Sequence, residues 1–471
     1  MRVQPAAGGA VRALAALLLT FAASAALAPG ATAAPAASPL NARLQEGACL
    51  NSNARVSLEL LIESCSTLIA AGNLSGDALA TAYFNRGAAY RASGDNEHAI
   101  ADYGEAIKLK PNFAAAFGNR ANVYQDLEQF DRAIDDYDES LRLNPGDARQ
   151  FYNRANAYRA KEMIDRAIQD YNEAIRLEPN FADAYDNRGI MYVAKGDYDR
   201  AIRDYDQAIK LRPDFADAFG NRGFAYTSKG DFDRAILDYD YALKLNPDDA
   251  IVYNNRGFAY SAKGDLDQAI EDYNQAVWHN SSYADAFANR GFAYSAKGDF
   301  DRAIIDYDEA IRLNPTDATV FQNRGIAYDN KGQQERAIKD YDQAIKLDPS
   351  DPEPLLNRCW ARATWGQQVE MALADCNESL RLRPNDAGAL SSRCFVKIRL
   401  HDLDGALLDC DASLKIEPQD AYALFERGVA RLLMGDQGGG ELDIAGSRRV
   451  DPEVEREFKG YGVVLETAPS N

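Results

Sequence analysis

The sequence predicts an all-α solenoid built from eleven helix pairs, and three observations support this fold class. Proline returns every 34 residues through most of the chain, and an Asn-Arg pair returns at the same interval. Within each interval the apolar residues lie three or four apart, a spacing that places their side chains on one face of a helix. A fixed period of this length indicates stacked structural repeats rather than one globular core.

The repeats extend from Ala80 to about Val454, with two irregular steps in the proline series. Ser281 stands where one proline is expected, and one step is 35 residues long because a residue is inserted near Gly366. The prolines are Pro111, Pro145, Pro179, Pro213, Pro247, Pro315, Pro349, Pro384, Pro418 and Pro452.

The fourth repeat illustrates why each repeat should form two helices. Gly196 ends the first helix, Asp197 can cap the second, and Pro213 ends the second helix. Gly189 is small enough to let the two helices approach closely, and Tyr205 is large enough to fill the space between them. The recurrent Lys-Gly-Asp sequence is therefore interpreted as a turn at 195–197, 229–231, 263–265 and 297–299.

The pattern resembles the tetratricopeptide repeat family, a 34-residue helix–turn–helix. That family has a large residue at position 4, small ones at 8, 20 and 27, aromatic ones at 11 and 24, and proline at 32. Counted from Ala80, these positions hold Tyr83, Gly87, Tyr90, Ala99, Tyr103, Ala106 and Pro111. The resemblance implies a right-handed superhelix with a concave surface, and it does not by itself specify a function.

One departure from the family pattern predicts a ladder of ion pairs. Position 7 is Arg and position 23 is Asp in all eleven repeats, for example Arg222 and Asp238. These positions should face each other in an antiparallel helix pair, and a partly buried charge needs its partner. An arginine row that grips acidic ligands is the alternative, although the Asp carboxylates would compete for the same guanidinium groups.

The first 33 residues predict a secretory signal peptide. Arg2 and Arg12 form a basic start, Ala13–Ala28 is a small and apolar run, and residues 31–33 offer a small-x-small cleavage site. The run is short for a membrane span of about 20 residues, although an uncleaved anchor is the alternative. Residues 34–48 are expected to be a flexible leader. We therefore expect an exported protein, periplasmic or secreted, without membrane insertion after cleavage.

Cysteine placement predicts disulfides near the two ends of the array. Residues 49–79 are interpreted as a degenerate N-terminal repeat, residues 80–454 as the eleven repeats, and residues 455–471 as a C-terminal cap and tail. On this alignment the cysteines occupy only positions 8 and 24, which in an exported chain is a disulfide signal. They are Cys49, Cys65, Cys359, Cys376, Cys394 and Cys410.

Equal sequence separations favour three bridges within single repeats, namely Cys49–Cys65, Cys359–Cys376 and Cys394–Cys410. Bridges between neighbouring repeats, such as Cys376–Cys394, and buried free thiols are the alternatives. A zinc site is disfavoured because no close C-x-x-C pair occurs.

Composition and motifs argue against several function classes. The formal net charge of -20 disfavours nucleic acid and anionic lipid as partners, because both require basic surfaces. The three histidines lie at different repeat positions, and no metalloprotease, P-loop or serine-hydrolase motif is present. We therefore predict no enzyme activity, no metal site and no cofactor.

The candidate binding residues form a row at position 6, which in this family tends to line the concave surface. A similar asparagine ladder in the repeat domain of O-GlcNAc transferase holds the backbone of an extended peptide. An amide suits that task because it both donates and accepts hydrogen bonds. Asparagines that bridge neighbouring helices are the alternative. The row is Asn85, Asn119, Asn153, Asn187, Asn221, Asn255, Asn289, Asn323 and Asn357.

Phe224, Phe258 and Phe292 follow at position 9 and complete the candidate peptide-binding surface, unless they only pack helix on helix. The sequence thus predicts an exported scaffold that binds an extended protein or peptide of unidentified sequence. The alternative is an accessory protein that binds a glycan or other small ligand, or that positions an envelope enzyme.

Overall fold

The computed structural model describes residues 46–50 and 56–463. The predicted signal peptide, residues 34–45 of the predicted leader and residues 464–471 of the predicted tail lie outside the described residues. Residues 46–50 are helical, and the described residues form helices and turns without any β-strand. The all-α prediction is therefore confirmed.

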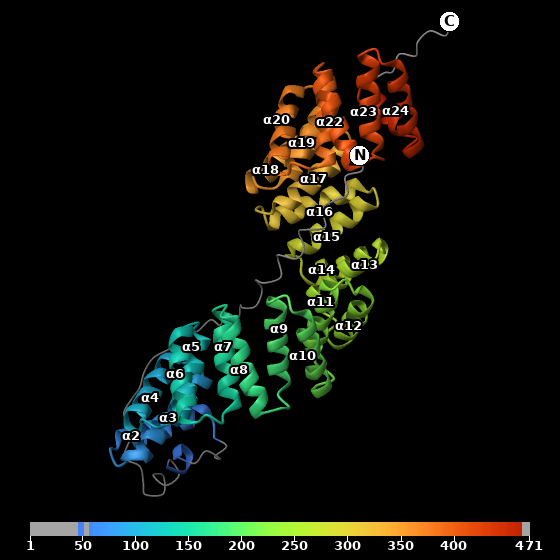
Figure 1. Cartoon of the computed structure of the whole chain (residues 1–471). Coiled ribbons are helices and arrows are strands. Elements are labelled where there is room, and N and C mark those ends of the chain that lie inside the picture. The colour runs from blue at the N-terminus through green and yellow to red at the C-terminus, as the bar shows by residue number, and fades with distance from the viewer. Residues whose placement is uncertain (1–45, 51–55, 464–471) are drawn as a thin grey trace. The chain divides into compact units, whose positions relative to one another are not determined.

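The chain divides into two compact parts, of which the first ends at Pro247. Figure 1 colours this part blue to green. Its helices are α2 (Leu58–Ala70), α3 (Gly76–Ala92), α4 (Asn96–Leu109), α5 (Ala114–Asp126), α6 (Phe130–Leu143), α7 (Ala148–Ala160), α8 (Ile164–Leu177), α9 (Ala182–Ala194), α10 (Tyr198–Leu211), α11 (Ala216–Ser228) and α12 (Phe232–Leu245).

The second part begins at Asp248. Its helices are α13 (Ala250–Ala262), α14 (Leu266–His279), α15 (Ala284–Ala296), α16 (Phe300–Leu313), α17 (Ala318–Asn330), α18 (Gln334–Leu347), α19 (Pro352–Trp365), α20 (Val369–Leu382), α21 (Ala387–Arg399), α22 (Leu403–Ile416), α23 (Ala421–Leu433), α24 (Gln437–Val450) and α25 (Val454–Gly460).

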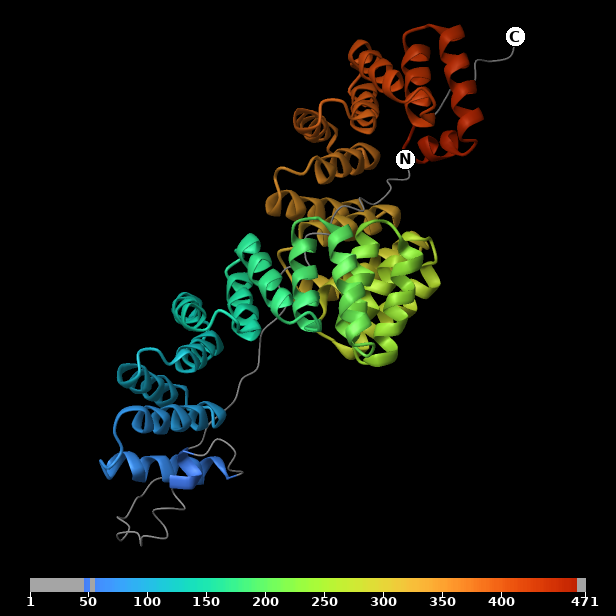
Figure 2. The same ribbon diagram turned by 60° about the horizontal axis from the view of Figure 1, so that its bottom comes forward.

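The helices pair as the repeat predicts. Each odd-numbered helix from α3 to α23 is the first (A) helix of a repeat, and the helix that follows it is the second (B) helix. Every A helix packs against its own B helix, and within each part successive pairs pack on one another (Figures 1 and 2). This stacking of helix pairs defines an α-solenoid of repeats.

The turns between A and B helices follow from the Lys-Gly-Asp sequence. Gly196 has a φ of 72°, a left-handed conformation that glycine adopts without steric cost. The Asp197 carboxylate then accepts the backbone N–H of Arg200 at 3.1 Å and caps α10. Lys195 pairs with Asp165 of the preceding repeat at 2.6 Å. The interpretation of this sequence as a turn is confirmed, and the lysine also links neighbouring repeats.

Close helix packing depends on glycine opposite tyrosine. A Cβ atom added at Gly223 would lie 2.7 Å from Cε1 of Tyr239, whose side chain is fully buried. No larger residue fits unless the helices move apart. The same arrangement recurs in Gly189–Tyr205, Gly257–Tyr273, Gly291–Tyr307 and Gly325–Tyr341.

The predicted arginine–aspartate ladder is present in every repeat. In the fifth repeat, Nε and Nη2 of Arg222 donate to the two carboxylate oxygens of Asp238 at 2.8 and 2.6 Å. Burial raises the pKa of Asp238, and the hydrogen bonds from Arg222 oppose that shift. The other pairs are Arg86–Asp102, Arg120–Asp136, Arg154–Asp170, Arg188–Asp204, Arg256–Asp272, Arg290–Asp306, Arg324–Asp340, Arg358–Asp375, Arg393–Asp409 and Arg427–Asp443.

Most of these arginines also contact the preceding repeat, which the sequence analysis missed. Nη1 of Arg222 donates to Asp206 of α10 at 2.6 Å, so one guanidinium joins α10, α11 and α12. Arg120 lacks this contact because Gly104 occupies the corresponding place. The equivalent contacts are Arg154–Asp138, Arg188–Asn172, Arg290–Asn274, Arg324–Asp308, Arg358–Asp342, Arg393–Asn377 and Arg427–Asp411.

Three disulfides replace the glycine–tyrosine contact near the ends of the array. The structure joins Cys49 to Cys65, Cys359 to Cys376 and Cys394 to Cys410, each within one repeat. All six cysteines are buried. Each bridge links the A and B helices of its repeat covalently, at the same place where other repeats rely on close packing alone.

The ladder generates a prediction about stability. Arg222→Leu should destabilise α10, α11 and α12 by about 3–5 kcal/mol, because Asp238 would stay buried without its cation. Amide hydrogen exchange should report the loss locally, since long repeat arrays do not unfold as one cooperative unit. Arg222→Leu combined with Asp238→Leu should recover most of the protection, because no unpaired charge is left buried. Equal loss of protection in both variants would contradict this account.

The bridges generate a second prediction. Replacing Cys394 and Cys410 together by alanine should cost about 3 kcal/mol of stability, because a bridge across 16 residues restricts the unfolded chain. Hydrogen exchange should rise in α21 and α22 but not in α11 and α12, which contain no cysteine. In the natural chain, peptide mapping without reductant should recover all three bridges that the structure shows. A fragment that links Cys376 to Cys394 would show bridging between repeats instead.

Candidate binding face

The candidate site is the surface made by positions 2, 5, 6, 9, 12 and 13 of successive A helices. These positions are three or four residues apart and therefore share one face of each helix. The B helix of the same repeat packs against other positions of the A helix, such as Gly223. We call this surface the A-helix face, and each part of the chain has one.

The asparagine row lies on the A-helix face and is half-buried, apart from Asn357, which is only 4% exposed. Its Nδ2 has no hydrogen-bond partner among the described residues. Asn357 is therefore too enclosed to offer its amide to a ligand.

Several asparagines bridge one A helix to the preceding one. Nδ2 of Asn221 donates to Asp186 of α9 at 3.0 Å, and Nδ2 of Asn289 donates to Asn254 of α13 at 3.0 Å. The acceptor in both cases is position 5 of the preceding repeat. The bridging role that the sequence left open is therefore present in both parts of the chain.

The first repeats extend this network with further polar groups. Nδ2 of Asn187 donates to the Tyr152 hydroxyl at 2.7 Å, while Nη1 of Arg159 donates to the Asn187 carbonyl oxygen at 2.9 Å. Asn153 donates to Asn122 at 3.0 Å. Asn85 donates to the backbone carbonyl of Cys49 at 2.7 Å, which ties the first repeat to residues 46–50. Asn119 interacts with Tyr103.

Asn323 differs from these asparagines. Its amide has no hydrogen-bond partner among the described residues, because the preceding A helix presents Ala288 at position 5 and Phe292 at position 9. Neither side chain can accept or donate a hydrogen bond. Asn323 on α17 and Phe292 on α15 are both half-buried, and they hold the positions at which Asn153 and Asn122 meet earlier in the chain.

The phenylalanine row occupies the same face. Phe224 belongs to the first part of the chain, whereas Phe258 and Phe292 belong to the second, and all three are half-buried. In the second and third repeats Asn122 and Asn156 hold this position instead, and each accepts a tyrosine hydroxyl from its own B helix at 2.6 Å. The A-helix face thus changes from polar to apolar along the chain.

Several acids on this face have raised pKa values that the sequence did not predict. Asp186 is 6% exposed, and burial raises its pKa to about 6, with Asp217 and Asp183 acting in the same direction. In the second part, burial raises the pKa of Asp329 to about 6. Burial and Asp317 raise the pKa of Asp285. The sequence shows that acids stand at positions 2, 5 and 12 of these repeats, but it does not show how deeply their side chains are buried.

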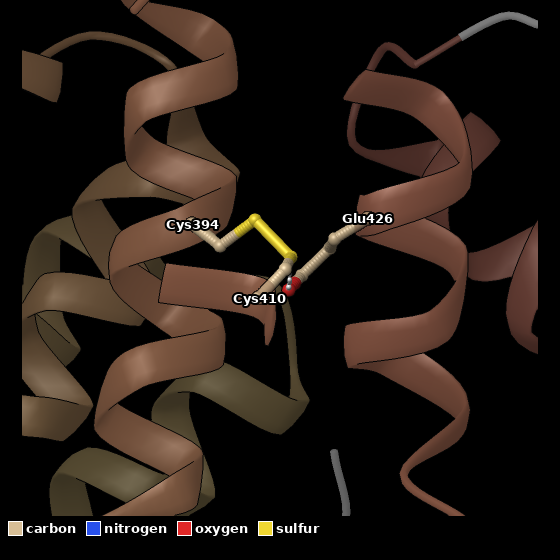
Figure 3. A group of neighbouring side chains, drawn as sticks. All are labelled: Cys394, Cys410 and Glu426. Carbon is tan, nitrogen blue, oxygen red and sulfur yellow. Dashed lines mark hydrogen bonds between the residues drawn. A yellow bond between two sulfur atoms is a disulfide. The ribbon is translucent and has the colours of Figure 1, made fainter. Parts of the chain in front are cut away.

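Glu426 takes the place of asparagine in the last repeat and lies beside the Cys394–Cys410 bridge (Figure 3). It is fully buried, and Ser391 Oγ donates to its Oε2 at 2.7 Å. Burial raises its pKa well above the ordinary value. Because both sulfurs are consumed in the disulfide, this group offers a metal only one carboxylate, and it forms no metal site in the oxidised protein.

Sequence comparison identifies the family. A TPR repeat model matches residues 87–128, 155–196, 189–228 and 223–264. A tetratricopeptide repeat model matches residues 114–147, 250–283, 284–317 and 318–351. Together these matches cover residues 87–147 and 155–351, more than half of the chain. The chain belongs to the tetratricopeptide repeat family, whose repeats form scaffolds for protein–protein interaction.

Three of the solved structures that the chain matches are described by their identity and coverage. MamA is 29% identical over 34% of this chain and 94% of its own, with a TM-score of 0.33. YrrB is 26% identical over 39% of this chain and 95% of its own, with a TM-score of 0.34. A tetratricopeptide repeat protein from Parabacteroides merdae is 19% identical over 53% of this chain and 98% of its own, with a TM-score of 0.44. A search among curated proteins finds no significant match.

Among residues 46–50 and 56–463, no helix combines the length and the apolar character that a bilayer crossing requires.

Asp186 allows a prediction about pH. Because folding raises its pKa from the ordinary 3.8 to about 6, its contribution to stability is full below pH 4 and is lost as pH rises through 6. Asp186→Asn should therefore stabilise the protein at pH 7.5 by up to about 3 kcal/mol and have little effect at pH 4. Amide hydrogen exchange of α9, compared between the variant and the natural chain at each pH from 4 to 8, measures this difference.

Asn254 provides the matched control, because it occupies the same position as Asp186 and accepts the same hydrogen bond from the next repeat. Asn254→Asp should lower stability at pH 7.5 and not at pH 4. A difference between Asp186→Asn and the natural chain that does not vary with pH would show that Asp186 keeps an ordinary pKa.

Proposed function

We propose that this protein is an exported scaffold whose A-helix face binds an extended segment of another protein. The single observation that carries the proposal is the pair of half-buried side chains Asn323 and Phe292, at the positions where Asn153 and Asn122 meet earlier in the chain. An amide can hold the backbone of an extended chain through one donor and one acceptor. A phenyl ring can cover an apolar side chain of the same segment.

Charge supports a partner with basic residues. The chain carries a formal charge of -20, and partly exposed acids lie on the A-helix face at Asp285 and Asp329. A lysine or arginine of the partner would favour the ionised form of these carboxyl groups. Charge complementarity of this kind speeds association and suppresses wrong partners.

Export is supported by two independent features. The first 33 residues have the basic, apolar and small-residue order of a signal peptide. The three buried disulfides suit an oxidising compartment, because thiols stay reduced in most cytosolic proteins.

The asparagine row should divide into two functional groups. Asn323→Ala should weaken partner binding by about 1 kcal/mol, roughly fivefold, and leave stability almost unchanged, because its amide has no partner within the described chain. Asn289→Ala should also lower stability, because it leaves the buried Asn254 side chain without its donor. Capture from the exported fraction, followed by titration calorimetry with the captured protein, measures affinity. Amide hydrogen exchange of the helices around each substituted residue measures stability.

Two results would contradict the proposal. If Asn323→Ala binds the captured protein as tightly as the natural chain, the amide does not hold the partner. If capture yields a glycan or another small ligand and no stoichiometric protein, the chain acts as an accessory binder instead.

A further inference from the structure

The short C-terminal helix α25 departs from the repeat pattern and packs on the A-helix face. Its Phe458 is fully buried, with its ring centroid 5.2 Å from Phe395, 4.6 Å from Phe425 and 6.3 Å from Trp360. Trp360 and Phe395 hold position 9 of the ninth and tenth repeats, and Phe425 holds position 5 of the last. One phenyl ring thus contacts the same face of three successive repeats.

Polar contacts fix the segment around this ring. The Tyr422 hydroxyl donates to Oε2 of Glu457, the residue before Phe458. Nη1 of Arg399 donates to the backbone carbonyl oxygen of Tyr461 at 2.7 Å, and the Tyr461 ring lies 5.6 Å from Trp360. The face therefore binds one carboxylate, two aromatic rings and one main-chain carbonyl of the segment.

These features are those of a peptide site rather than of a continuous solenoid. Buried aromatic anchors and charge-assisted hydrogen bonds carry most of the energy in typical recognition sites. A regular A helix would pack on the repeat just before it, whereas Phe458 reaches Trp360 two repeats before the last one. We call Trp360, Phe395, Arg399, Tyr422 and Phe425 the aromatic seat.

Besides the aromatic seat, the burial of Val454 is the main contact that holds α25 in place. The helix has seven residues and no side-chain cap at its start, and isolated helices of that length are unstable in water. Its other ion pairs, Arg456–Glu453 and Arg448–Glu455, join largely exposed side chains. Exposed pairs contribute little to stability. A competing segment that fills the aromatic seat would therefore meet only the cost of displacing one short helix.

We propose that the aromatic seat is a binding site for a short partner segment, and that α25 is its intramolecular occupant. The segment carries an acidic residue directly followed by an aromatic one, with a second aromatic residue three positions later. This is the order of Glu457, Phe458 and Tyr461. Tyr422 binds the acid, Phe395 and Phe425 enclose the first ring, and Arg399 binds the backbone beside the second ring.

The occupant lowers the apparent affinity for a partner. A tethered segment competes at an effective concentration of roughly millimolar. A partner must therefore bind the vacated seat tightly enough to overcome that competition. The inference is independent of the asparagine row, whose member in the ninth repeat, Asn357, is buried.

The test uses a fluorescent synthetic peptide with the sequence of residues 451–463, the natural full chain and three full-length variants. Phe458→Ala combined with Tyr461→Ala should bind the peptide at least about tenfold more tightly than the natural chain, because its own segment no longer competes. Adding Arg399→Ala should weaken that binding, and a peptide with alanine in place of Phe458 should not bind. Leu408→Ala, which changes an exposed side chain on α22, serves as the control and should bind like the natural chain.

Circular dichroism measures the helix content of the variant and shows whether the substitutions unfold part of the chain. Should Phe458→Ala with Tyr461→Ala lose helix content, added peptide should restore it, because the peptide fills the same seat. Equal peptide affinity for the natural chain and the variant would overturn the proposal. So would a variant that neither binds the peptide nor regains helix in its presence, since α25 would then be a structural cap only.

Discussion

Each repeat places one arginine between two helices of its own and, in most repeats, one helix of the repeat before. The guanidinium group has five donors in a planar fork, which suits a bidentate carboxylate on one side and a single acceptor on the other. Arg222 satisfies Asp238 within its repeat and Asp206 in the preceding one. A lysine could not make both contacts, because its single ammonium group cannot match a carboxylate in a fork. The stacking of the described repeats depends on this shared cation.

The ladder of Arg–Asp pairs limits the size of the side chains that can lie between the A and B helices. Since Arg and Asp fix the separation of the A and B helices, the space beside them must be filled by a glycine and a tyrosine in most repeats. Near the ends the same space holds a disulfide. Where the bridge replaces tyrosine, Arg362 and Lys397 supply second cations to Asp375 and Asp409. The ninth and tenth repeats thus combine a covalent link with a doubled ion pair, near the C-terminal end of the array where a solenoid has fewer neighbours.

The A-helix face serves two purposes that compete for the same atoms. The side-chain amides of Asn221 and Asn289 each donate one hydrogen bond to the preceding A helix and so stabilise the stack. Their side-chain carbonyl oxygens remain as acceptors for a ligand. Asn323 makes no such contact within the described chain and keeps its full hydrogen-bonding capacity. The difference arises from the preceding repeat, because Asp186 and Asn254 can accept a hydrogen bond whereas Ala288 cannot. In the last repeats the face is occupied by α25, whose aromatic side chains fill the space that a ligand would need.

Features that recur at a fixed period could be predicted from the sequence alone, because each depends on residues close together in the chain. The helix pairs, the Lys-Gly-Asp turn and the Arg222–Asp238 contact all lie within one repeat and obey helical spacing. Contacts between repeats could be read only from the tertiary structure, because they depend on the side chain that the neighbouring repeat places opposite. Asp186 acquires a raised pKa only because the stack buries it, and Asn221 becomes a bridge only because Asp186 is opposite. Likewise α25 has the local sequence of a helix, but its place on Trp360 and Phe395 follows from burying Phe458, which no local pattern reveals.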